Sequence, residues 1–202
     1  MFMGAGPEVH GYTEWGSRTP ELPSRVIVKN NIFPTIFQIY RDANPKAEIG
    51  VLSEWAGIQF LVDTLSTDYH AVAPDYNKFP TALCEMAEKY IKENKPSLVA
   101  ICFDNPDHVG HKEGHDTPAY YSKLEELDGY IARIVAAVKE AGMYDDTIFI
   151  ITSDHGGIKK GHGGKTMAEM QTPFIIAGKN IKKAGEFQES MVQYDVAATM
   201  AY

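Results

Sequence analysis

The sequence has few cysteines, no basic cluster and no long apolar run. Cys84 and Cys102 are its only cysteines and neither lies in a paired metal-binding motif, so we interpret both as small core residues and leave a disulfide between them open. The formal net charge is −8, which makes a nucleic-acid polymer an unexpected partner. No run of apolar residues reaches the length of a membrane span. The sequence does not show a charged start followed by an apolar stretch, which is the pattern of a secretory signal.

Length and composition are those of one ordinary globular domain. The 202 residues are 44% hydrophobic and 23% charged, which is sufficient to bury a core. No internal repeat and no low-complexity segment is present. The first 21 residues are rich in glycine, proline and aromatics and predict an irregular loop. We therefore treat residues 1–202 as a single domain, which we expect to be partial because no strand or helix precedes this loop.

Predicted strands and helices alternate along the chain. Apolar runs predict strands at 48–53, 69–73, 97–103, 148–152 and 173–177. Apolar residues at helical spacing predict helices at 33–43, 56–65, 81–93, 118–143 and 194–202. The run 97–103 is apolar on both faces, as in a central strand of a parallel sheet. The order predicts an α/β fold with a mainly parallel sheet sandwiched by helices.

The strand that begins at Ile148 ends in a group of potential metal ligands. It stops at Asp154 and His155, and two glycines come next. His162 lies seven residues beyond His155 and has a glycine on each side. Carboxylate and imidazole are good ligands for zinc or manganese, and glycine lets the backbone crowd a site that side chains would block. A polar turn after a strand is the alternative interpretation.

A second acid and imidazole pair follows the predicted strand 97–103. Pro106 ends regular pairing, so a loop or a short helical turn is expected. One helical turn would place Asp107 and His111 on the same side, and Gly110 would relieve crowding beside the imidazole. A surface loop with Asp–His contacts is the alternative. Two further imidazoles are weaker candidates, expected to lie behind the ligands or to face solvent: His108 and His115.

Both groups follow the carboxyl ends of strands, where ligands of α/β sheets gather. We therefore expect five side chains to converge: Asp107, His111, Asp154, His155 and His162. Five ligands are more than one closed zinc site needs. They suit two metal ions about 4 Å apart, which clamp both oxygens of an in-line displacement at phosphorus.

The order of these motifs resembles the alkaline phosphatase superfamily, closest to its type I phosphodiesterase/nucleotide pyrophosphatase branch. The ligand motifs that carry the resemblance are Asp107-x-x-Gly110-His111, Ser153-Asp154-His155-Gly156-Gly157 and Gly161-His162-Gly163. Their surroundings agree at Asp128-Gly129-Tyr130-Ile131, Asp145-Asp146-Thr147 and Thr172-Pro173-Phe174-Ile175. The segment from Gly4 to Gly11 resembles the one just after the nucleophile in that branch. The likeness therefore covers nearly the whole chain.

The resemblance implies an alkaline phosphatase-like domain whose five ligands are shared between two metal ions. Asp107, His111 and His162 would hold one metal, and Asp154 and His155 the other. It also implies an Asp at the end of a first strand and a Thr or Ser nucleophile, both upstream of Met1. The hydroxyls present near the start lie past the expected position: Thr13, Ser17 and Thr19. The chain is thus expected to lack the first strand and the nucleophile, and to end before the domain does.

The implied parent protein is a two-metal-dependent hydrolase of phosphate mono- or diesters. Zinc is the expected metal and manganese the alternative, and the expected substrate is a small phosphate or sulfate ester. Sulfatases and metal-dependent phosphomutases are the open alternatives within the superfamily. A catalytically silent metal-binding domain and a purely structural α/β domain are the alternatives from other classes. Lys112 or Lys165 is a weaker candidate for holding an anionic substrate, and the resemblance alone suggests a periplasmic or extracellular location.

Overall fold

The computed structural model describes residues 1–27, 30–186 and 188–202. These residues form two compact units. The first comprises Met1–Pro74, Pro96–Cys102 and Glu189–Tyr202, and the second comprises Asp75–Lys95 and Phe103–Gln188. None of the helices in the described ranges has the length and apolarity that a bilayer crossing requires.

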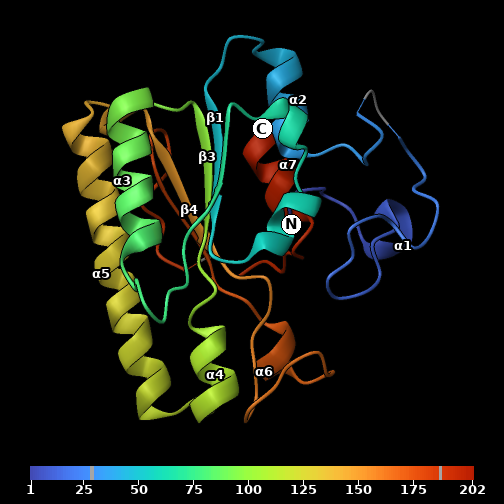
Figure 1. The fold of residues 1–202 in the computed structure, drawn as a ribbon, viewed down its shortest axis with the longest axis vertical. Coiled ribbons are helices and arrows are strands. Elements are labelled where there is room, and N and C mark those ends of the chain that lie inside the picture. The colour runs from blue at the N-terminus through green and yellow to red at the C-terminus, as the bar shows by residue number, and fades with distance from the viewer. Residues whose placement is uncertain (28–29, 187) are drawn as a thin grey trace. The chain divides into compact units, whose positions relative to one another are not determined.

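The first unit is built around a three-stranded parallel sheet of order β2-β1-β3, of which Figure 1 labels β1 and β3. Its strands are β1 (Ile49–Ser53), β2 (Tyr69–Val72) and β3 (Leu98–Cys102). The fully buried strand is β1, whereas β3 is only partly buried along its length. The prediction that 97–103 is the central strand is therefore wrong. The reason is that β1 has hydrogen-bonded neighbours on both sides, while β3 pairs only with β1 among the described strands.

Two helices supply the core that covers this sheet. They are α2 (Ile36–Ala43) and α7 (Asp195–Ala201), while the short α1 (Pro7–His10) lies in the N-terminal loop. The backbone N–H of Gln38 donates to the hydroxyl of Thr35 at 3.3 Å, which caps the start of α2. Phe37 from α2, Val51 from β1 and Ala197 from α7 are buried in one cluster. Packing against the sheet thus fixes both helices.

The segment 56–65 differs from the single helix that its pattern predicts. It forms two 3₁₀ helices, η1 (Ala56–Phe60) and η2 (Thr64–Ser66). A Cβ at Gly57 would lie 2.1 Å from the ring of Trp55, so the ring packs directly on this backbone. The carboxylate of Asp63 accepts a hydrogen bond from the N–H of Leu65 at 3.1 Å and starts a new turn there. Local side-chain contacts therefore override the apolar spacing.

The helices of the second unit include a long pair that runs in the same direction, because Cys84, Glu88 and Lys92 on one helix contact Tyr130, Arg133 and Glu140 on the other. The pair is α3 (Ala82–Asn94) and α5 (Pro118–Glu140), which lie side by side (Figure 1). Leu83 on α3 and Leu127 on α5 are buried, as their helical spacing predicts. Gly142 follows α5 in the left-handed conformation with a φ of 72°, which fits its predicted role as a stop. Cys84 is buried, and Cys84 and Cys102 are thiols rather than a disulfide.

The two strands of the second unit pair with each other in antiparallel fashion. They are β4 (Ile148–Thr152) and β5 (Phe174–Gly178), with Ile148 opposite Gly178. In the described part of the chain β4 does not join the parallel sheet, so the expectation that one sheet carries both ligand groups is wrong. The connection between β4 and β5 contains only the one-turn helix α6 (Met167–Met170). A parallel return is usually made through an α-helix that crosses the sheet, and this connection has only the single turn of α6.

Arg133 on α5 and Glu88 on α3 form a two-point ion pair, with Nε–Oε1 and Nη2–Oε2 distances of 2.8 and 2.9 Å. The hydrogen bonds from Arg133 hold the pKa of Glu88 below its usual value. The pair therefore stabilises the fold above the unfolded pKa of about 4.3 and loses this contribution as pH falls through the lower folded pKa.

We expect Glu88→Gln to lower the free energy of unfolding at neutral pH by about 0.5–1 kcal/mol, because both side chains are partly exposed. The difference from wild type should vanish as the carboxylate is protonated. Urea unfolding at pH values above and below this window measures it, with Glu93→Gln on the exposed side of α3 as the control. Equal destabilisation on both sides of the window would contradict the assignment.

Candidate metal centre

Asp107 and His111 lie one turn apart on α4 (Asp107–Glu113), as their spacing predicts. Pro106 occupies the position before this helix, after β3 has already ended at Cys102. The Oδ2 atom of Asp107 is 3.2 Å from Nε2 of His111. The short helix thus presents a carboxylate and an imidazole on the same side.

His162 reaches the same carboxylate from the glycine-rich segment after β4. Its Nε2 atom is 3.8 Å from Oδ1 of Asp107. One ligand atom from each of Asp107, His111 and His162 lies within 4.8 Å of the other two. Two of these side chains are partly buried and His111 is exposed. Three of the five predicted side chains therefore form a compact cluster of one oxygen and two nitrogen atoms.

Backbone carbonyls orient two of the imidazoles. Nδ1 of His111 is 3.0 Å from the carbonyl oxygen of Lys160, and Nδ1 of His155 is 2.8 Å from that of Gly156. A carbonyl oxygen only accepts hydrogen bonds, so Nδ1 must carry the proton and donate it. In the neutral ring this leaves the lone pair on Nε2, the arrangement found in metal-ligating histidines.

One oxygen of Asp107 is buried without a hydrogen-bond donor. Oδ1 has no hydrogen-bond partner, although the side chain as a whole is 34% exposed. The nitrogen atoms that face it are Nε2 of His115 at 3.5 Å and Nε2 of His162 at 3.8 Å. A buried carboxylate oxygen without a partner is costly. A cation bound among these atoms would satisfy it, so the donor set fits a divalent metal ion.

Asp154 and His155 adjoin this cluster. The rings of His155 and His162 stack with centroids 3.7 Å apart and planes inclined by 19°. Oδ2 of Asp154 is 3.5 Å from Nε2 of His155, and the Asp154 side chain is 77% exposed. All five predicted side chains are thus linked by successive contacts. Asp154 and His155 stand beside the three-residue cluster rather than within it.

The local environment favours the neutral form of His162. Burial lowers its pKa below the ordinary value, and the neighbouring His155 lowers it further. Metal binding requires a deprotonated imidazole nitrogen. At neutral pH the ring is therefore in the form that a metal needs.

His115 is the residue of this region whose placement the sequence did not determine. Its ring is buried against Asp107 rather than exposed, with 8% of the residue accessible. The ring that Gly110 accommodates is also that of His115, because a Cβ at Gly110 would lie 2.4 Å from its Nε2. The sequence signal for this placement was Gly114, whose positive φ ends α4 just before His115. His108 packs edge-on against Tyr76 at 5.0 Å.

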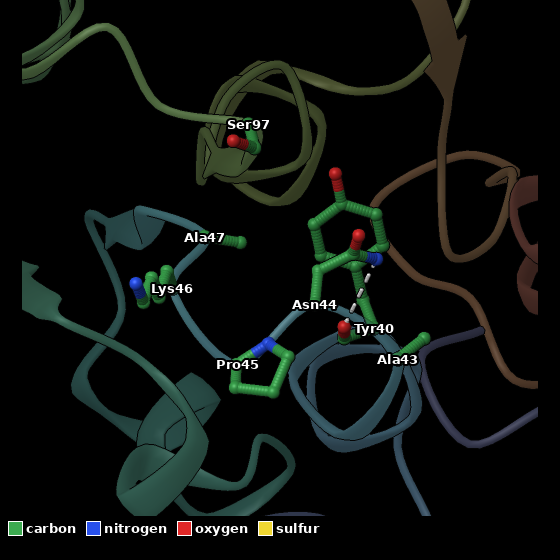
Figure 2. Close-up of a pocket in the computed structure, with 7 residues that line it drawn as sticks. All are labelled: Tyr40, Ala43, Asn44, Pro45, Lys46, Ala47 and Ser97. Carbon is green, nitrogen blue, oxygen red and sulfur yellow. Dashed lines mark hydrogen bonds between the residues drawn. The ribbon is translucent and has the colours of Figure 1, made fainter.

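A pocket of about 420 Å³ lies in the first unit, near the end of α2 and the amino ends of β1 and β3 (Figure 2). Figure 2 shows Tyr40, Asn44 and Ser97 among its lining residues. Ligands of α/β proteins bind beyond the carboxyl ends of the strands, at the opposite edge. None of the residues that line it belongs to the Asp107/His111/His162 cluster.

The α/β fold is alkaline phosphatase-like. The sequence profile of the type I phosphodiesterase/nucleotide pyrophosphatase family matches residues 3–179. The chain belongs to this family, as the motif order predicted.

Three known proteins illustrate the relationship. Human GPI ethanolamine phosphate transferase 2, catalytic subunit, is 27% identical over 133 residues, covering 63% of this chain and 14% of that protein. The 2,3-bisphosphoglycerate-independent phosphoglycerate mutase of Vibrio vulnificus (strain YJ016) is 30% identical over 158 residues, covering 75% and 29%. The structure of murine ectonucleotide pyrophosphatase/phosphodiesterase 5 in complex with AMP matches with a TM-score of 0.53 and 20% identity, covering 77% and 43%. The chain thus matches less than half the length of each.

Proposed function

We propose that the protein carrying this chain is a two-metal-dependent hydrolase of phosphate mono- or diesters, of the nucleotide pyrophosphatase/phosphodiesterase kind. Asp107, His111 and His162 would hold one divalent ion, and Asp154 and His155 would contribute to the other. The observation that carries the proposal is the buried Oδ1 of Asp107, which faces imidazole nitrogens without a hydrogen-bond donor. Nitrogen and oxygen ligands favour zinc, with manganese as the alternative.

The residues of this chain would prepare the site for an anionic ester. Bound divalent ions supply Lewis acidity, which polarises the phosphoryl oxygens and makes an attacking oxygen more acidic. Asp107 contributes negative charge that offsets the charge of a cation. The carbonyls of Lys160 and Gly156 fix the rings of His111 and His155 with Nε2 available. Gly161 and Gly163 have open space where a Cβ would stand, so the backbone beside His162 stays accessible to a substrate.

Phosphoryl transfer to an acceptor other than water is the second candidate. Its support is that the human relative is named a transferase and the bacterial relative a mutase. The same charge arrangement serves both outcomes, because the acceptor alone distinguishes hydrolysis from transfer. Ester-hydrolysis assays with and without an alcohol acceptor separate the two candidates.

The test combines metal binding with ester hydrolysis. The full-length protein that carries this chain is stripped of metal, titrated with zinc against a chelating dye, and then assayed with bis(4-nitrophenyl) phosphate, 4-nitrophenyl phosphate and 4-nitrophenyl sulfate. We expect zinc binding and phosphate-ester hydrolysis that is lost in the double variant Asp154→Ala/His155→Ala and retained in Asp145→Ala, an exposed acid before β4.

Three outcomes would contradict the proposal in different ways. Zinc binding without hydrolysis of any ester indicates a catalytically silent metal-binding domain. Hydrolysis of the sulfate ester alone indicates a sulfatase. Failure to bind zinc or manganese indicates a structural domain in which the five side chains have no metal role.

A further inference from the structure

His115 joins the two segments that carry the cluster. It lies two residues beyond α4, which bears Asp107 and His111, and its side chain is only 5% exposed. The backbone N–H of His115 donates to the carbonyl oxygen of Lys159 at 2.6 Å, and its ring Nδ1 donates to the same oxygen at 3.1 Å. Lys159 belongs to the segment between β4 and His162. A single carbonyl thus holds both the backbone and the ring of His115.

The ring occupies a slot that two glycines provide. A Cβ at Gly110, on α4, would lie 2.4 Å from Nε2 of His115. A Cβ at Gly157, in the segment after β4, would lie 2.2 Å from Cδ2 of the same ring. The ring of Tyr120, at a centroid distance of 5.3 Å, packs on a further side. The imidazole is therefore wedged between the two ligand-bearing segments and has little room to move.

The Lys159–Lys160 turn connects His115 with a cluster residue. Ile158 and Gly161 exchange two backbone hydrogen bonds, at 2.9 and 3.1 Å, which fix the turn between them. Its two consecutive carbonyls accept from Nδ1 of His115 and Nδ1 of His111, respectively. Nε2 of His115 then faces the buried Oδ1 of Asp107 at 3.5 Å. One ring thus contacts the carboxylate and the turn that orients His111.

We propose that His115 is a positioning residue of the metal centre. By donating to Lys159 from within the glycine slot, it locks α4 to the turn and holds Asp107 and His111 in register with His162. It thereby sets the affinity of the Asp107/His111/His162 site for a divalent ion without being a ligand itself. This inference rests on the proposed function, because it assumes that these three side chains bind a metal.

The test measures zinc affinity of the metal-stripped protein by competition with a chelating dye. Replacing a residue that orients the metal ligands from behind typically costs about 10–100-fold in metal affinity. We expect a loss of this size for His115→Leu, which fills the slot but cannot donate to Lys159. His115→Asn should bind more tightly than His115→Leu, because its Nδ2 replaces the Nδ1 donor. His108→Leu, an imidazole change on α4 facing Tyr76, is the matched control and should bind zinc as wild type does.

The order of the two variants separates positioning from packing. If His115 served only to fill space, His115→Leu would retain affinity better than His115→Asn, which leaves a cavity; that order would overturn the inference. Wild-type affinity in His115→Leu would overturn it as well. Absence of zinc binding by the wild-type protein would overturn the proposed function and this inference together.

A measurement on the unmodified protein covers the case in which a variant does not fold. Long-range ¹H–¹⁵N spectra of the metal-free protein, at about pH 8 where imidazoles are neutral, identify the protonated ring nitrogen. We expect the Nδ1–H form for His115 and for His111. An Nε2–H form of His115 would overturn the inference, because Nδ1 would then have no proton to donate to Lys159.

Discussion

Replacing Asp107 by asparagine is expected to weaken zinc binding by more than about 100-fold, the upper range for changes that act only through a ligand's neighbours. The substitution keeps the shape of the side chain but removes its negative charge and exchanges one of the oxygens that face His111 and His162 for an amide nitrogen. An amide oxygen is a weaker ligand for zinc than a carboxylate. Dye competition with the metal-stripped protein measures the loss, and Asp128→Asn, an exposed acid on α5, is the charge-matched control.

The same substitution should have the opposite effect on stability when metal is absent. Oδ1 of Asp107 is buried without a donor, so removing its charge should leave the free energy of unfolding of the metal-free protein unchanged or raise it. With zinc at about 100 times its dissociation constant, wild type should gain about 2.7 kcal/mol and Asp107→Asn almost nothing. If Asp107→Asn destabilised the metal-free protein and left the zinc response intact, the carboxylate would be structural and not a ligand.

Replacing Gly110 by alanine should destabilise the protein although alanine is the better helix former. Inside α4 the exchange would normally gain about 0.5–1 kcal/mol. Here the new Cβ would lie between 2.4 and 2.7 Å from three ring atoms of His115, which is buried and held by Lys159. Overpacking of this kind costs about 1–3 kcal/mol, so the clash outweighs the helix preference. Urea unfolding of the metal-free protein gives the difference.

The effect should change sign when the ring is removed. In a His115→Ala background the slot is empty, and Gly110→Ala should then stabilise the protein by its ordinary helix preference. A double-mutant cycle on Gly110 and His115 measures the coupling between the two positions. Additive effects would show that the ring moves aside at little cost, which would contradict the close packing described for this region.

The elements with strong local patterns were predictable from the sequence. The apolar stripe of α5 and the glycine after it fixed that helix to within a few residues. The four-residue spacing of Asp107 and His111 predicted their common side of α4. The glycines around His162 marked it as a candidate, and its Nε2 does face Asp107. The helix α5 and the common side of Asp107 and His111 depend on interactions between residues close in sequence, which the periodicity of the sequence indicates.

The features that sequence reasoning missed depend on contacts between distant residues. Apolar composition alone did not distinguish β3 from the buried β1, because burial follows from the number of neighbouring strands. The direction of β5 depends on the path of its connection, which apolar runs do not reveal. The place of His115 depends on Gly157 and Lys159, more than 40 positions away along the chain. Side-chain identity gave no sign of that contact.

The Lys159–Lys160 turn has a consequence for how this region tolerates substitution. Both imidazoles are held by peptide oxygens, which every amino acid supplies, and not by the lysine side chains. What matters at position 159 is a backbone with a φ of 52°, a geometry that asparagine or glycine adopts more readily than lysine. The side chain at position 159 is therefore free to vary over evolutionary time, provided that the shape of the bend is inherited, whereas the Nζ of Lys160 donates to the carbonyl oxygen of Lys112 at 2.7 Å.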